Sequence, residues 1–266
     1  MTARLLALLA FVCLALPAMA QMPILGESME RRERLQIGVS TTQIAITSDF
    51  AGADLTVFGS VDYADELLMA IGQYDVIVAL EGPRDNATVR KKERMFGIWV
   101  NRRAMTFETV PESYSISSTR AVDSIAVEDA LNDRGVGISH IPLIPVGFVG
   151  NAANLGEFRE AYRRLKQSSG LYERDATGVR FVSPSLFRAT LRLPANIPNG
   201  VHTVRAYLFK SGVFIEEKQL LLRVVKTGLE QAITDAAHEK PFFYGLFAVF
   251  LALVTGWAAS VIFKKN

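Results

Sequence analysis

The chain has 266 residues, half of them hydrophobic, with 29 Lys and Arg against 27 Asp and Glu and a formal net charge of +2. This length allows one or two domains, and so small a net charge argues against nucleic acid as a partner. The hydrophobic residues are spread unevenly, because two apolar blocks lie near the two ends of the sequence.

The first apolar block is typical of a secretory signal peptide over residues 1–20. A positive residue precedes an apolar stretch over 5–16, and the small residues Ala18 and Ala20 stand at the −3 and −1 positions of a cleavage site. The stretch is short for a membrane span, which favours cleavage over the alternative of an uncleaved anchor. Cys13 is the one cysteine in the sequence, so the mature chain would form no disulfide bond.

Residues 21–34 are polar and charged and form a predicted lead-in, after which the sequence changes to short runs of period two. Alternation of apolar and polar residues is typical of strands. The run over 74–80 predicts a more deeply buried strand. Other predicted strands include 42–47, 54–59, 96–100, 105–107 and 114–116.

The middle of the chain has helical spacing instead. Apolar residues line one side of 123–132, and a second helix is predicted from Asn154 to near 168, with Asn154 and Glu157 as a capping pair. Strands return from residue 179, and the turn at 210–212 joins the last two into a hairpin.

We therefore predict a mainly β fold over residues 35–226. Its simplest form is an immunoglobulin-like antiparallel sandwich with a helical insertion at about 120–175. Two small β domains are the alternative. The strand order does not follow from the sequence.

The second apolar block predicts one C-terminal transmembrane helix over 242–263, preceded by a stalk over 227–241. About 22 residues at 1.5 Å each make roughly 33 Å, enough to cross a hydrocarbon core. Two lysines lie in the tail over 264–266. Since positive residues prefer the cytoplasmic side, the tail is expected inside a bacterial inner membrane and the bulk of the chain in the periplasm.

Small residues recur every four positions along this helix at Ala248, Ala252, Gly256 and Ser260, and Gly245 lies beside this repeat. In lipid, small residues let two helices approach closely and gain van der Waals contact. The stripe is therefore a candidate packing face for another transmembrane helix. The alternative is ordinary Ala and Gly content with no partner.

A search for catalytic chemistry finds no recognisable site. The histidines His140, His202 and His238 do not have metal-ligand spacing. The sequence has no Gly-x-Ser-x-Gly elbow and no phosphate-binding glycine motif. We predict no catalytic, cofactor-binding or metal-binding residues, and no enzyme.

A basic cluster surrounds Trp99. Its candidate contacts with a small anion or with lipid headgroups are Arg90, Lys92, Arg94, Arg102 and Arg103. The alternative is a strand face and loops that are solvated.

Several segments resemble an alphaproteobacterial family of transmembrane proteins. They are 35–41, 52–59, 96–101, 193–200 and 204–209. The segments are structural in character, so the resemblance transfers no catalytic residue. It implies a neighbourhood of sulfite- and sulfonate-exporter-type permeases, and hence an accessory role beside a transporter.

Three functions are weighed on these grounds. The first is a membrane-anchored periplasmic accessory protein that packs on a multi-span membrane protein such as a transporter. The second is an envelope structural or assembly factor that recognises its targets by strand addition or loops. The third is an enzyme whose site is not recognisable from the sequence.

Overall fold

A computed structural model describes residues 32–147, 152–228, 233 and 237–263. Four predicted segments lie wholly or partly outside the described residues: the signal peptide (1–20), the lead-in (21–34), the stalk (227–241) and the tail (264–266). The chain divides into two compact units, 1–32 and 33–266, and the second contains the helices and strands described below.

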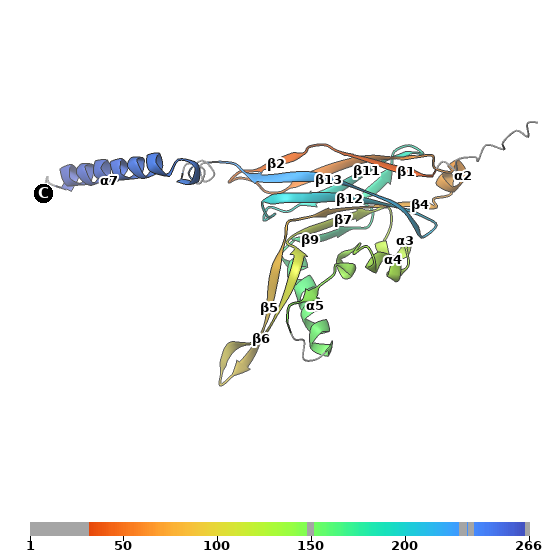
Figure 1. Cartoon of the computed structure of the whole chain (residues 1–266), viewed down its shortest axis with the longest axis horizontal. Helices are drawn as coiled ribbons and strands as arrows, with labels where there is room; N and C mark the ends of the chain where they lie inside the picture. The colour runs from red at the N-terminus through yellow and green to blue at the C-terminus, as the bar shows by residue number, and fades with distance from the viewer. Residues whose placement is uncertain (1–31, 148–151, 229–232, 234–236, 264–266) are drawn as a thin grey trace, which may run out of the picture. The chain divides into compact units, whose positions relative to one another are not determined.

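Strands dominate the second unit (Figure 1). The strands are β1 (Arg34–Val39), β2 (Gln43–Ile46), β3 (Ala53–Asp62), β4 (Tyr74–Glu81), β5 (Arg84–Met95), β6 (Ile98–Pro111), β7 (Tyr114–Ser118), β8 (Ile144–Pro145), β9 (Tyr172–Asp175), β10 (Val179–Phe181), β11 (Leu186–Leu193), β12 (Gly200–Lys210) and β13 (Val213–Lys226). The helices are α2 (Glu66–Ala70), α3 (Val122–Ile125), α4 (Glu128–Asn132), the 3₁₀ helix η1 (Ile138–His140), α5 (Ala152–Ser168) and α7 (Pro241–Phe263).

Two sheets form a sandwich. One has the strand order β1-β3-β11-β10 and the other β2-β13-β12-β4-β7-β9. Strands that lie before and after the helical insertion pair directly, since β3 pairs with β11 and β4 with β12. Most pairs are antiparallel, but β2 runs parallel to β13 and β7 parallel to β9.

Side chains that alternate along the strands fill the space between the two sheets. On β3 and β11 every second residue points inward, so that Val57 and Leu191 are fully buried. They belong to the same apolar cluster as Val78 on β4 and Val204 on β12. Burial of these aliphatic side chains is the main force that holds the sandwich together.

The helical insertion covers the outer face of the larger sheet. Phe158 and Tyr162 on α5 share an apolar cluster with Phe107 and Ile77. The hydroxyl of Tyr162 donates to the carbonyl oxygen of Pro111 at 3.4 Å. Because the insertion covers one face and the sandwich core the other, all eight residues of β4 are buried.

The predicted fold class is confirmed: the chain is mainly β, with an immunoglobulin-like sandwich, a helical insertion and one C-terminal apolar helix. Three details were wrong. The two parallel pairs depart from an antiparallel sandwich. The helix expected over 123–132 is interrupted at Ala126, whose backbone is extended, so that α3 and α4 are separate. Asn154 lies inside α5, so it does not cap that helix.

A third sheet, with the order β5-β6-β8, was not predicted. Its two long strands form a hairpin that follows directly after β4 in the chain. This hairpin contains every residue of the predicted basic cluster.

Candidate membrane and partner interface

The base of the β5–β6 hairpin is fixed by apolar packing. Val89 on β5 and Phe107 on β6 are buried in the same cluster as Phe158 on α5. The short strand β8 extends the sheet, with Phe107 opposite Pro145 and Glu108 opposite Ile144. The hairpin and α5 are therefore one packed structure at this end (Figure 1).

One face of the hairpin is held by ion pairs. Lys91 pairs with Glu157 of α5. Glu93 pairs with Arg103 at 2.8 Å and with Arg102 at 3.2 Å. Arg103 also donates to the side-chain oxygen of Asn154 at 3.3 Å. The hydrogen bond from Arg103 lowers the pKa of Glu93, so this carboxylate is charged at neutral pH.

The other face presents three cations in a row. Arg90, Lys92 and Arg94 alternate along β5 and are exposed. In the part of the chain that the structure describes, none of the three has an ion-pair or hydrogen-bond partner. Arg94 lies opposite Trp99 on β6. The five predicted basic residues thus divide into a free row of three and a pair, Arg102 and Arg103, that neutralises Glu93.

The tip of the hairpin is apolar, a feature that was not predicted from the sequence. Phe96 and Gly97 form the turn, with φ angles of 49° and 87°. The exposed fractions are 101% for Phe96, 68% for Trp99, 64% for Ile98 and 39% for Met95. A sequence signal was present, since an apolar run over 95–100 is flanked on both sides by basic residues.

The turn places a bulky residue where the backbone disfavours it. Two-residue hairpin turns of this kind need positive φ at both central positions, which favours Asn, Asp or Gly. A phenylalanine there costs roughly 1–2 kcal/mol. Since Phe96 makes no compensating burial, stability does not account for its presence at the tip.

The candidate packing face on α7 is open within the chain. Gly245, Ala248, Ala252, Gly256 and Ser260 are all exposed, and a Cβ atom built on either glycine meets no atom within 4 Å. Residues 241–260 are apolar and long enough to cross a bilayer, and the described residues contain one such helix. The hydroxyl of Thr255 donates to the carbonyl oxygen of Leu251 at 2.8 Å, so it is satisfied without a partner helix.

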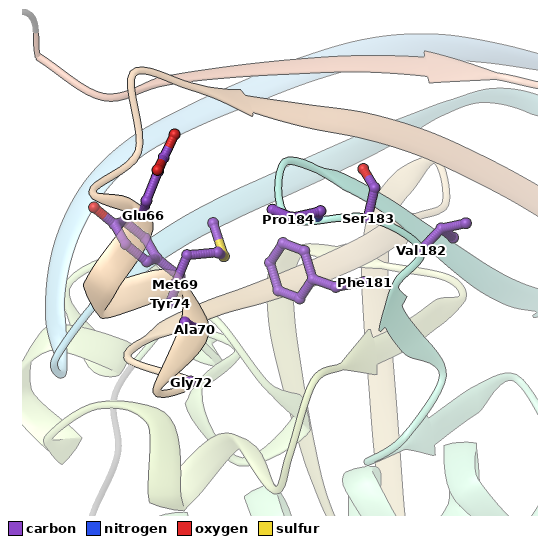
Figure 2. A pocket seen from close by; sticks show the side chains of 9 residues that line it. All are labelled: Glu66, Met69, Ala70, Gly72, Tyr74, Phe181, Val182, Ser183 and Pro184. Carbon is purple, nitrogen blue, oxygen red and sulfur yellow. The ribbon is translucent and has the colours of Figure 1, made fainter.

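A pocket of about 600 Å³ lies between α2 and the β10–β11 connection. Figure 2 shows the Phe181 ring and the Met69 side chain pointing toward one another across it, with Pro184 and Tyr74 beside them. The Glu66 carboxylate points away from the Phe181 ring (Figure 2). A specific ligand site normally combines apolar walls with convergent polar groups, and the lining of this pocket does not supply them.

The ionisable groups in the sandwich serve to hold strands together. Arg120 binds the buried Asp75 through two nitrogens, at 3.0 and 2.6 Å. Arg205 lies between Glu81 and Glu217. Among the described residues, no three His, Cys, Asp or Glu side chains gather in a way that could hold a metal ion.

The three histidines lie apart. His202 is fully buried on β12, with its Nε2 3.4 Å from the hydroxyl of Ser113. His140 ends the 3₁₀ helix, and His238 lies in the stalk, within its described residues 237–241. The geometry brings none of them together.

These features define a class of protein: a β-sandwich joined to one apolar helix of membrane-spanning length. The model of the family described as "Putative transmembrane protein (Alph_Pro_TM)" matches residues 34–265. The chain therefore belongs to this family of alphaproteobacterial transmembrane proteins.

Two solved structures are similar to parts of the chain. AggA, the major subunit of aggregative adherence fimbriae type I from Escherichia coli, has 7% identity and a TM-score of 0.25, with 74% of this chain and 96% of that one covered. The N-terminal domain of the Streptococcus gordonii adhesin Sgo0707 has 9% identity and a TM-score of 0.25, with 72% and 33% covered. No curated protein sequence matches the chain.

Proposed function

We propose that this chain is a non-enzymatic accessory protein, anchored by α7 in the bacterial inner membrane with its sandwich in the periplasm and its C-terminus in the cytoplasm. The observation that carries the proposal is the apolar surface of α7, which no described part of the chain covers. The signal-like sequence over 1–20 and the two lysines after the helix support the orientation.

The partner in this proposal is a multi-span membrane protein, such as a transporter. The stripe from Gly245 to Ser260 supports it, because a face of small residues gives a second helix close backbone approach. The neighbourhood of permeases that the sequence resemblance implies points the same way.

The non-enzymatic role is supported by how the chain uses its ionisable groups. Asp75 on β4 pairs with Arg120, which follows β7, and Glu81 pairs with Arg84 on β5 and Arg205 on β12. Such pairs have a structural explanation that requires no substrate.

Co-purification of the full chain after mild detergent extraction tests the partner. A Gly256→Leu variant should lose the bound membrane protein, because the larger side chain prevents close approach. Ala258→Leu is the matched control: it makes a similar change two residues, or about 200°, further round the helix. The partner proposal fails if no membrane protein co-purifies, or if both variants behave like the wild type.

Cysteine labelling tests the orientation. In a Cys13→Ala background, single cysteines replace Ser183 on the sandwich or Lys265 after the helix. A membrane-impermeant maleimide should label Ser183→Cys in intact spheroplasts, and Lys265→Cys after lysis. The reverse pattern would overturn the proposed topology.

A further inference from the structure

We infer that the tip of the β5–β6 hairpin inserts into the surface of the bilayer that holds α7. Phe96 enters the acyl region, Arg94 binds the anionic headgroups, and Lys92 is attracted to them from just outside the headgroup layer. The inference rests on the anchoring by α7 in the proposed function. It does not depend on the partner helix.

The first argument is the chemistry of the tip. Met95, Phe96, Ile98 and Trp99 form an exposed apolar end, and Phe96 is fully exposed. Exposed apolar groups gathered at one place mark a contact with a partner or a membrane. Phe96 also holds a turn position that favours Asn or Gly, so the aromatic ring is present against the local preference of the backbone.

The second argument is the order of groups along the hairpin. Strand residues rise about 3.3 Å each, so Arg94 lies about 7 Å behind Phe96 and Lys92 about 13 Å behind it. The headgroup region is roughly 5–8 Å thick on each side of the hydrocarbon core. With Phe96 at the acyl boundary, Arg94 reaches the headgroups. Lys92 lies outside them but within about one Debye length, roughly 8–10 Å, of their charge.

Trp99 fits the same depth. It lies opposite Arg94 in the β-ladder, and tryptophan concentrates at the membrane–water interface. The apolar, aromatic and cationic groups of the hairpin therefore follow the sequence of layers found in a bilayer.

The third argument is charge. Residues 90–103 contain six Lys and Arg and one carboxylate, Glu93. Each basic residue near an anionic lipid surface strengthens binding by about fivefold. Arg94 and Lys92 of the free row supply this attraction, because Arg102 and Arg103 already pair with Glu93.

The fourth argument is confinement. The proposed function places α7 in a membrane, as the family and the length of this apolar helix suggest, and residues 227–240 join it to β13. The sandwich therefore stays close to that bilayer, where a weak contact is effective because the local lipid concentration is high. We commit to this bilayer as the occupant, in preference to an apposed membrane or a protein.

Fluorescence of the full chain in single-copy nanodiscs tests the inference. The sequence contains two tryptophans, Trp99 and Trp257, so Trp257→Phe makes Trp99 the sole tryptophan reporter. In discs of anionic lipid brominated in the acyl chains, Trp99 emission should fall at least about twofold below that in unbrominated discs. Brominated zwitterionic discs should quench it less.

Charge variants in this background sharpen the test. Replacing Arg90, Lys92 and Arg94 with Gln should reduce the quenching, and Glu93→Gln should increase it by freeing two arginines. The matched control replaces Arg180, Arg188 and Arg192, exposed on the sandwich, with Gln. It removes the same charge and should leave the quenching unchanged.

Three results would overturn the inference. Trp99 could remain open to an aqueous quencher in the anionic discs. It could be shielded without quenching by brominated lipid, which would indicate protein contact. It could also be quenched only by brominated anionic vesicles added to zwitterionic discs, which would indicate an apposed membrane. The discs hold no other protein, so each result is separate from the test of the partner helix.

Discussion

Two hairpins in this chain have the same turn geometry, but their side chains differ in burial and in the contacts they make. The β12–β13 turn has φ angles of 49° at Ser211 and 84° at Gly212, and the β5–β6 turn has 49° at Phe96 and 87° at Gly97. Ser211 donates its backbone N–H to the carbonyl oxygen of Gln73 at 2.8 Å. Phe96 is fully exposed.

The strands differ as the turns do. Along β12 six of eleven residues are buried, whereas only Val89 is buried along the twelve residues of β5. Both turns thus need positive φ angles at their two central residues, but the burial of the strand side chains differs. This difference indicates that the two hairpins have different roles. The β12–β13 hairpin builds the core, and the β5–β6 hairpin presents a surface.

The largest expected effect is a loss of stability at a core position of the β12–β13 hairpin. Leu208→Ala on β12 removes a fully buried side chain and should lower the free energy of unfolding by about 2–5 kcal/mol. Ile98→Ala at the other hairpin's tip, where the side chain is 64% exposed, should change it by at most about 0.5 kcal/mol. Denaturant unfolding of both variants measures the difference, and equal losses would contradict the division of roles.

Charged residues should show the same contrast on a smaller scale. Arg205 on β12 pairs with Glu217 at 3.2 Å and lies 3.7 Å from Glu81. Arg205→Ala should lower the free energy of unfolding by about 1–2 kcal/mol, because Glu81 is largely buried and loses a neighbouring cation. Arg102→Ala on the exposed hairpin should cost less than about 0.5 kcal/mol. A larger loss for Arg102 than for Arg205 would reverse our assignment.

Sequence patterns predicted the core hairpin better than the exposed one. Alternation and a Ser-Gly turn marked both β12 and β13, and the apolar run over 74–80 marked β4. For the β5–β6 hairpin the sequence predicts two short strands, 96–100 and 105–107, which fall on the turn and β6, and no strand over β5. The reason is that Phe96 is not a turn-forming residue and the strands carry charges in place of an alternating apolar face.

The candidate site was predicted in part for related reasons. The basic residues are visible in the sequence. Their division into a free row and a paired set depends on the β5–β6 register, which brings Arg102 and Arg103 to Glu93, and on α5, whose Asn154 accepts a hydrogen bond from Arg103. The parallel pairing of β2 with β13 is likewise a long-range choice, which local patterns do not encode.

Acidification should weaken the core hairpin through His202 on β12. Burial lowers the pKa of this imidazole, so the fold accommodates its neutral form. In the unfolded chain this imidazole binds a proton below about pH 6.5. The stability that its neutral form contributes to the fold is therefore fully present above that pH and is lost as the pH falls below it. The decline is at most about 1.4 kcal/mol per pH unit. Thermal unfolding from pH 7.5 to 5.5 should show a flatter dependence for His202→Gln, and an unchanged slope would exclude this group.

The smallest expected effect is a gain in stability, at the exposed tip of the β5–β6 hairpin. Phe96→Asn should raise the free energy of unfolding by about 0.5–1 kcal/mol, because asparagine tolerates positive φ and no buried contact is lost. The same variant should reduce the lipid quenching of Trp99 in anionic nanodiscs. A gain in stability coupled to a loss of contact is expected where a residue is kept for function against the local preference.

Ser211→Asn in the core hairpin is the matched control for this variant. Its backbone has the same φ, but the substitution removes the 3.1 Å hydrogen bond between the Ser211 hydroxyl and the Gln73 side chain. It should therefore gain less stability than Phe96→Asn and leave the Trp99 signal unchanged. If Phe96→Asn instead destabilises the chain, the phenylalanine has a packing role in the fold, and the contrast between the two hairpin tips disappears.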